Sequence, residues 1–423
     1  MIQKKQTVLF GFLFIILLTT ACTGAVGPAG PVGPAGAPGP IGPVGPAGED
    51  ATASQAYVGS ETCGQCHEDI YARFQLSGHP YKLTKIEAGQ PPVFPYDEIT
   101  GGIPSPPEGY TWDDVTYVIG GYGWKARFVD DRGFIITGDA DSLTQYNFAN
   151  EFVEKSAEWV SYHAGEELPY DCGACHSTGY RPEGHQDDLE GIVGTWAFPG
   201  VQCEACHGPG SRHADDPYGV LMRVDRSSQL CGDCHVRGNP AEIDAADGFE
   251  QHHEQYEDLY NSKHFAISCV TCHDPHAGTR FADDEVNPNK GIVQVCESCH
   301  FQNVRRNVRN HLGMDCIDCH MAPMALSAQG NLDLFRADVR SHQFAINTEP
   351  DAPQFNEDGT VVMPYLTLQY ACGQCHNGAK ASELETAVLA AAADGYHDKP
   401  TPTPEPTPIL EVEATPTPET QSP

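Results

Sequence analysis

The chain has 423 residues, 17 of them cysteine, and a formal net charge of −34. So large an excess of acidic side chains excludes nucleic acid as a natural partner, because the phosphate backbone would be repelled. Length alone would suggest two or three domains. The spacing of the cysteines, described below, argues instead for one long unit.

The first 22 residues have the features of an export signal. Two lysines supply a basic start, and the apolar run from Val8 to Leu18 is too short for a confident membrane span. Cys22 follows a small residue, as at a bacterial lipoprotein cleavage site, although Leu18 lies one position too far from it for that pattern. We expect residues 1–22 to be a signal peptide with Cys22 as a lipid-bearing residue. An ordinary cleavage site with an incidental cysteine is the alternative.

Residues 23–50 contain a strict Gly-X-Y repeat, with glycine at every third position from Gly24 to Gly48. Only glycine fits the axis of a collagen triple helix, so the repeat predicts a collagen-like segment. A single chain in the polyproline II conformation is the alternative, and it would reach roughly 75 Å. In either form the segment would act as a spacer between the membrane and the rest of the chain.

The chain beyond the spacer is organised around a five-residue unit, Cys-x-x-Cys-His, which occurs eight times. Each unit can attach one c-type haem, because its two thiols add to the vinyl groups of the porphyrin and its histidine binds the iron. We therefore predict eight covalently attached haem c groups in an octahaem domain spanning residues 51–396. The predicted attachment residues and proximal ligands are Cys63, Cys66, His67, Cys172, Cys175, His176, Cys203, Cys206, His207, Cys231, Cys234, His235, Cys269, Cys272, His273, Cys296, Cys299, His300, Cys316, Cys319, His320, Cys372, Cys375 and His376.

Zinc binding and redox disulfides are the alternatives for any single Cys-x-x-Cys unit. Neither needs a histidine directly after the second cysteine, and all eight units have one. The units use every cysteine except Cys22, whereas a zinc or disulfide protein would leave cysteines outside the pattern. The pattern therefore favours haem attachment.

We expect a mainly α fold with much irregular structure and a small β-hairpin region, wrapped around a chain of stacked haems. About 39 residues per motif leave little chain for a side-chain core, so the porphyrins would supply much of the apolar interior. The hairpin is predicted from the alternating segments 116–119, 125–129 and 134–137, with a glycine-containing turn before the last. Residues 382–393 are a predicted helix, capped by Ser382 and stopped by Gly395.

Eleven histidines remain outside the motifs, enough to give every iron a second imidazole. Methionine is the minor option, because only three methionines lie near a motif. His185, His252 and His397 lie in polar stretches and are equally well explained as surface residues. The histidines that we favour as distal ligands are His79, His213, His264, His276, His311 and His342.

Residues 397–423 are rich in Thr-Pro and Glu-Pro and cannot build a core. We expect them to form a disordered, extended tail.

Several segments resemble the multihaem cytochrome c superfamily. The branch in question includes tetrahaem electron carriers, hydroxylamine oxidoreductases and octahaem tetrathionate reductases. In that superfamily stacked haems form a wire, and the resemblance implies distal ligation by His79, His264 and His311. Some of its reductases replace the motif histidine of the catalytic haem with lysine, whereas all eight units here keep histidine. The segments that carry the resemblance are 57–60, Tyr71, 77–79, 202–213, 269–276 and 311–323.

These features leave three hypotheses. The first is an exported, lipid-anchored cytochrome on the outer face of the membrane or at the cell surface, passing electrons to other redox proteins or extracellular acceptors. The second is an oxidoreductase acting on a small nitrogen or sulfur compound at one open haem, with Lys125, Arg127 or Arg237 binding an anion. The third is a subunit of a homo-oligomer or of a polymeric cytochrome filament.

Overall fold

The computed structural model describes residues 55–281, 290–302, 311 and 313–398. The predicted signal peptide, the Gly-X-Y spacer and nearly all of the predicted tail lie outside the described residues. No helix in the described part is long and apolar enough to cross a membrane.

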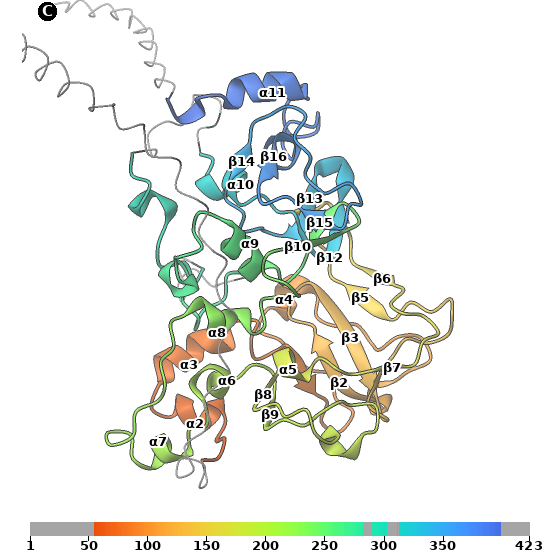
Figure 1. The fold of residues 1–423 in the computed structure, drawn as a ribbon. Coiled ribbons are helices and arrows are strands. Elements are labelled where there is room, and N and C mark those ends of the chain that lie inside the picture. The colour runs from red at the N-terminus through yellow and green to blue at the C-terminus, as the bar shows by residue number, and fades with distance from the viewer. Residues whose placement is uncertain (1–54, 282–289, 303–310, 312, 399–423) are drawn as a thin grey trace, which may run out of the picture. The chain divides into compact units, whose positions relative to one another are not determined.

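The prediction of a mainly α fold is wrong, because the motif-free stretches form two substantial β-sheets (Figure 1). The prediction averaged the spacing of the motifs, but the first and second motifs are separated by more than 100 residues, which is enough chain for a sheet of its own. The seven-stranded sheet consists of β1 Leu83–Lys85, β2 Val115–Gly120, β3 Lys125–Asp130, β4 Phe134–Ile135, β5 Gln145–Asn147, β6 Glu158–Val160 and β7 Leu168–Pro169.

Strand β2 shows why this sheet has a core on both faces. Side chains alternate across a strand, so Tyr117 and Ile119 point to one face and Val118 to the other. Tyr117 and Ile119 pack with Trp196 in one apolar cluster, while Val118 packs with Phe128 in a second. All five side chains are buried. The sequence therefore builds a side-chain core here without any contribution from a porphyrin.

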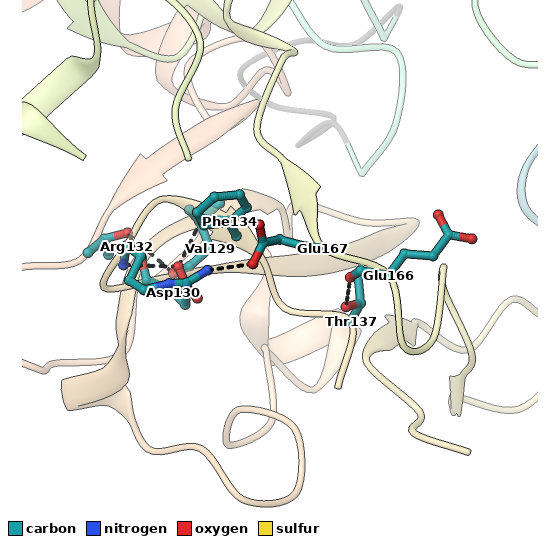
Figure 2. A network of polar contacts seen from close by, with 8 residues as sticks. Val129, Asp130, Arg132, Phe134, Thr137, Glu166 and Glu167 are labelled. Atoms are coloured by element: carbon teal, nitrogen blue, oxygen red, sulfur yellow. Dashed lines mark hydrogen bonds and ion pairs between the residues drawn. The ribbon is translucent and has the colours of Figure 1, made fainter. Parts of the chain in front are cut away.

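The predicted β-hairpin is present, and its turn is held by polar contacts (Figure 2). The Asp130 carboxylate accepts hydrogen bonds from the backbone N–H groups of Arg132, at 3.0 Å, and Phe134, at 2.8 Å. Arg132 donates to the Glu167 carboxylate at 3.2 Å, just before β7, which pairs with β4. These contacts connect β3 to the segment that enters the second motif at Cys172.

The second sheet has the strand order β13-β12-β11-β10-β15, with one parallel pair, β11 and β12. Its core includes Phe249, Met324, Leu366 and Tyr370. Two short pairs complete the β structure of the described residues. The strands are β10 Ile243–Ala246, β11 Phe249–Gln251, β12 Ala325–Asn331, β13 Arg336–Val339 and β15 Val361–Val362, with the pairs β8 Ser177–Thr178 and β9 Phe198–Pro199, and β14 Ile346–Asn347 and β16 Leu366–Thr367.

The α-helices are short, and half of those in the described residues contain part or all of a motif. A Cys-x-x-Cys-His unit needs only one turn, so the motifs do not produce the long helices of an α-helical protein. The predicted helix at 382–393 begins four residues later than expected. The α-helices are α2 Ser60–Gly64, α3 Glu68–Gln75, α4 Asp97–Thr100, α5 Gly173–His176, α6 Cys203–His207, α7 Ser211–Asp215, α8 Ser228–Gly232, α9 Gln255–Asn261, α10 Cys316–His320 and α11 Thr386–Ala393.

Single turns of other helix types complete the described secondary structure. They are the 3₁₀ turns η1 Trp112–Asp114, η2 Gln186–Asp188, η3 Cys269–Thr271, η4 Cys296–Ser298, η6 Leu332–Leu334 and η8 Tyr396–Asp398, and the π turn η7 Gln369–Gly373.

Candidate haem-binding sites

The motifs, numbered 1 to 8 in chain order, fold locally as one helical turn. In motif 2 the carbonyl of Cys172 accepts hydrogen bonds from the N–H groups of Cys175, at 3.3 Å, and His176, at 3.1 Å. Motif 8 repeats this turn, with both N–H groups 3.0 Å from the carbonyl of Cys372. The turn brings the two sulfurs and the imidazole to one side, as attachment to a single porphyrin requires.

All eight motifs line one continuous cavity of about 4200 Å³, and every motif cysteine and histidine contributes to its wall. A drug-sized ligand occupies a pocket of roughly 300–1,000 Å³, so the cavity has room for several large groups. Protein interiors are close-packed, and a lining of this extent would be unstable unless it were filled. The cavity therefore fits a set of haems held side by side.

Seven motif histidines have a second imidazole at nearly constant distance, with ring centres 5.9–6.3 Å apart. Two imidazoles on opposite sides of one metal have centres roughly 6 Å apart, because each metal–nitrogen bond is about 2 Å long. The pairs are His67 with His213, His207 with His276, His235 with His79, His273 with His342, His300 with His264, His320 with His397 and His376 with His311.

The structure thus places all six histidines that we favoured as distal ligands opposite a motif histidine. It also shows that no group of three or more histidine, cysteine or acidic side chains in the described residues is arranged to hold a bare metal ion. Two imidazoles facing each other can supply the two axial ligands of a haem iron, whereas a structural zinc site needs four ligands around one ion.

Hydrogen bonds to Nδ1 orient several of these rings. His207 Nδ1 lies 2.7 Å from the carbonyl oxygen of Arg223, and His320 Nδ1 lies 2.8 Å from that of Phe344. When Nδ1 carries the proton and donates it to a carbonyl, Nε2 keeps the lone pair that binds iron. The distal candidate His213 has the same arrangement, with Nδ1 2.6 Å from the carbonyl of Val220.

Sequence reasoning missed two histidines at these sites. His397, which we had placed in the tail, lies in η8 with its ring 5.9 Å from that of His320. His253 lies 6.2 Å from His235, so His235 has two imidazole neighbours, His79 and His253. No local pattern marks either residue. His252, for which ligation and a surface position were equally plausible, packs against His253 at 4.3 Å.

His163 and His185 have other partners. His163 Nδ1 lies 3.0 Å from the Glu166 carboxylate, and His185 Nδ1 lies 2.7 Å from the carbonyl of Ile192. Neither has a motif histidine at the distance found in the seven pairs.

His176 of motif 2 differs from the other seven motif histidines. All 19 histidines lie within the described residues. No histidine ring pairs with His176 at the distance of the seven pairs, although His253 lies close enough to interact with it electrostatically. Burial, together with the nearby charges of Lys82 and Arg127, lowers the pKa of His176 to about 4. The imidazole is therefore neutral, which is the form that binds iron.

Three cationic side chains surround this histidine. Lys82 precedes β1, while Lys125 and Arg127 lie two residues apart on β3 and so share one face of the strand. All three line the cavity but are otherwise enclosed by the fold. Burial lowers the pKa of each and brings that of Lys125 to about 7. Lys125 already donates to the carbonyl of Ser327 and lies near the Asp338 carboxylate, and Arg127 donates to Gln145. An anion, such as a haem propionate or a small ligand, would stabilise these cations further.

Contacts between thiols show which attachment sites are neighbours. Cys63 of motif 1 lies in hydrogen-bonding contact with Cys203 of motif 3, and this contact, with burial, raises the pKa of the Cys63 thiol. Similar thiol contacts join motifs 2 and 4, 4 and 5, and 6 and 7. In motifs 3 and 4, 5 and 6, and 7 and 8, a cysteine of one motif also lies close enough to raise the pKa of a cysteine of the other. The neighbour order is 1-3-4-5-6-7-8, with motif 2 adjoining motif 4.

Four carboxyl groups, those of Glu250, Glu254, Glu257 and Asp258, are buried beside these sites. Burial raises the pKa of Glu254 to about 8 and that of Asp258 to about 7, and it raises that of Glu250 strongly. Asp258 accepts a hydrogen bond from the backbone N–H of His342 at 2.5 Å. This contact fixes the backbone that presents the His342 ring to His273.

Comparisons with known proteins agree with this geometry. The family model "Cytochrome c554 and c-prime" matches residues 140–208, which include motifs 2 and 3. The multiheme cytochrome MtrA of Shewanella baltica is 23% identical over 206 residues, covering 45% of this chain and 56% of MtrA. The dissimilatory sulfite reductase MccA of Wolinella succinogenes is 22% identical over 411 residues, covering 70% of this chain and 55% of MccA. The chain thus spans just over half the length of these relatives.

The fold resembles that of one solved structure, and a second match has a lower score. The octaheme sulfite reductase MccA of Wolinella succinogenes has a TM-score of 0.51 at 17% identity, covering 82% of this chain and 70% of that one. The outer cell wall cytochrome OcwA has a TM-score of 0.48 at 17% identity, covering 78% and 86%. With the eight motifs, the family model and the two relatives above show that the chain is similar to multihaem c-type cytochromes.

Proposed function

We propose that the protein is an exported octahaem c-type cytochrome that transfers electrons between the membrane and acceptors or donors outside the cytoplasm. The observation that carries this proposal is the unbroken series of neighbouring attachment sites, seven of them with paired imidazoles. When bound, haem iron supplies reversible one-electron chemistry. The chain's own part is to hold each porphyrin through two cysteines and to fix the iron between two neutral imidazoles.

Paired imidazoles suit electron transfer because the iron keeps the same six ligands in both oxidation states, so little rearrangement accompanies each step. The neighbour order indicates a path from motif 1 to motif 8. Motif 1 follows closely on the predicted spacer, so the membrane-side partner would meet the path there. Other redox proteins are the expected partners, and a homo-oligomer or filament would extend the path between copies.

The location is proposed from the sequence. Residues 1–22 would direct export, Cys22 would carry a lipid, and residues 23–50 would hold the haem domain away from the outer face of the membrane. Bacteria and archaea attach haem to Cys-x-x-Cys-His outside the cytoplasm, which supports export independently.

Intact mass and electron paramagnetic resonance test the main proposal together. We expect eight haems per chain, seven of them low-spin. His213→Ala should convert one further haem to high-spin, because His67 would lose its partner. His163→Ala is the matched control and should convert none, since His163 bonds to Glu166 instead. A mass corresponding to six or fewer haems would refute the proposal.

His176 supports a second candidate function, reduction or oxidation of a small compound at the haem of motif 2. With no distal imidazole across from His176, its iron has a coordination position to which an external ligand can bind. The surrounding cations Lys82, Lys125 and Arg127 favour an anion. The sulfite reductase activity named for MccA makes a sulfur oxyanion a sensible first compound to test.

Ligand binding tests this second candidate. The reduced protein should bind one carbon monoxide per chain, and the oxidised protein should show a shift of its high-spin signal on adding sulfite or nitrite. Arg127→Met should weaken that anion binding, while Lys155→Met, at an exposed position away from the cavity, should not. Anion affinity unchanged in Arg127→Met would show that the cations serve the haem propionates instead.

A further inference from the structure

We propose that residues 386–398 form a strap that completes the coordination of the last two haems. In this proposal His397 is the second axial ligand of the haem at motif 7, and Tyr396 positions the second ligand of the haem at motif 8. The inference rests on haem attachment as proposed above. It assigns new roles to Tyr396, the last residue of the predicted haem domain, and to His397, which follows that domain.

The first observation is the geometry of His397. Its ring centre lies 5.9 Å from that of His320, and the two ring planes are within 22° of parallel. The six other pairs have ring centres 6.0–6.3 Å apart, close to this distance, so an iron bound by His320 would lie between the two rings. Both histidines line the common cavity. The position thus matches that of an axial ligand.

The second observation is the neighbouring tyrosine. The hydroxyl oxygen of Tyr396 lies 2.9 Å from Nδ1 of His311, whose ring is 6.1 Å from that of His376 in motif 8. If Nδ1 carries the proton, it donates to the hydroxyl and leaves Nε2 directed at the iron. Such a hydrogen bond increases the basicity of the imidazole and so favours ferric iron. Tyr396 would therefore lower the reduction potential of the haem at motif 8.

The helix that leads to both residues is short. Helix α11 is eight residues long and rich in alanine, a strong helix former, but so short a helix is marginal without tertiary packing. Leu389 is its one buried residue. Gly395, with φ +57°, lets the chain turn between the helix and η8 at little steric cost. Folding of the strap and ligation by His397 should therefore stabilise each other.

One short segment thus serves two adjacent haems. The thiols of Cys319 in motif 7 and Cys375 in motif 8 are neighbours, and motif 8 is the end of the neighbour order. Loss of the strap would therefore free one coordination position on the iron of the motif 7 haem and, at the same time, shift the reduction potential of the motif 8 haem. The strap therefore sets the coordination at the end of the electron path.

Variants of the full haem-loaded protein test the ligand. His397→Ala and a chain truncated after Gly395 should each show one more high-spin haem than the parent, and one more bound carbon monoxide. A chain truncated after Asp398 is the matched control and should show neither. Added imidazole should return the His397→Ala haem to low spin, which a misfolded site would not do.

Tyr396→Phe tests the positioning role separately. The number of high-spin haems should stay at the parental value, while the potential of one haem rises. A full set of potentials indistinguishable from the parent would overturn the role of Tyr396.

Haem content separates this inference from the main proposal. If a chain carries eight haems and His397→Ala has the parental high-spin count, the strap is wrong and the octahaem proposal stands. If the parent carries six or fewer haems, the octahaem proposal itself fails.

Discussion

The carboxylate of Glu204 connects the sites of motifs 1 and 3, and its replacement by glutamine gives a quantitative prediction. Glu204 lies in motif 3 and is 2% exposed. Its two oxygens accept hydrogen bonds from the backbone N–H groups of Val58 and Gly59, at 2.9–3.0 Å, and of Gly210, at 2.7 Å. Val58 and Gly59 immediately precede the helix that leads into motif 1.

The magnitude follows from these contacts. Hydrogen bonds to a charged group contribute roughly 1.5–3 kcal/mol each, and a buried donor left without a partner costs about 1–3 kcal/mol. Glutamine keeps one acceptor oxygen but presents an N–H₂ group to the remaining donors. We expect Glu204→Gln to lower the local stability of residues 56–61 by about 3 kcal/mol, or roughly a hundredfold in the opening equilibrium.

Hydrogen exchange followed by mass spectrometry measures this opening directly. Peptides covering residues 56–61 should exchange about a hundred times faster in Glu204→Gln, while peptides from the second sheet should be unchanged. Glu61→Gln is the control, because Glu61 is exposed on α2 and lies in the same peptide. Equal exchange rates in the two variants would refute the reasoning.

Further predictions concern stability and location. Burial raises the pKa of Tyr370 to about 12, so its contribution to the free energy of unfolding is complete below about pH 10 and is lost as the pH rises towards 12. Tyr370→Phe loses the hydrogen bond to the carbonyl of Gly248, so it should lower the free energy of unfolding by about 1 kcal/mol at pH 8, measured by urea unfolding. If the difference in unfolding free energy between variant and parent does not shrink by pH 12, the reasoning is wrong. Arg336 is buried and donates to two backbone carbonyls, so Arg336→Lys should cost about 2–3 kcal/mol, whereas Arg181→Lys at an exposed position should not shift the urea midpoint. Cys22→Ala should release the cytochrome from the membrane into the medium, and continued membrane association would favour an uncleaved anchor.

The sequence predicted local features better than long-range ones. Cys-x-x-Cys-His determines a single turn by itself, and histidines such as His79 and His264 stand in short patterns that mark them as ligands. His397 stands in no such pattern and becomes a candidate only where the fold returns it to His320. The contact between Cys63 and Cys203 joins residues far apart in the chain, so no spacing rule could have predicted the order of the haems.

The sheets were missed for a different reason. The segments 116–119, 125–129 and 134–137 were recognised as strands, but the other strands of that sheet are fragments of two or three residues, such as β5, β6 and β7. Strands that short carry no readable alternation of apolar and polar residues. The sequence also could not predict that His176 lacks a paired imidazole. Eleven histidines outside the motifs are enough for eight irons, and only the fold shows which motif histidines they pair with.

The separation of paired histidines along the chain has a consequence for assembly. If the chain leaves the cytoplasm with its N-terminus first, His67 emerges long before its partner His213, and His320 must wait for His397, close to the end of the folded part. Closing such long loops is entropically costly and slow. Each newly attached haem would therefore spend time with one face open to solvent and oxidants, and a chain cut short before His397 would never reach full coordination. Haems whose second ligand comes late in the chain are therefore more exposed to oxidants during maturation than in the finished protein.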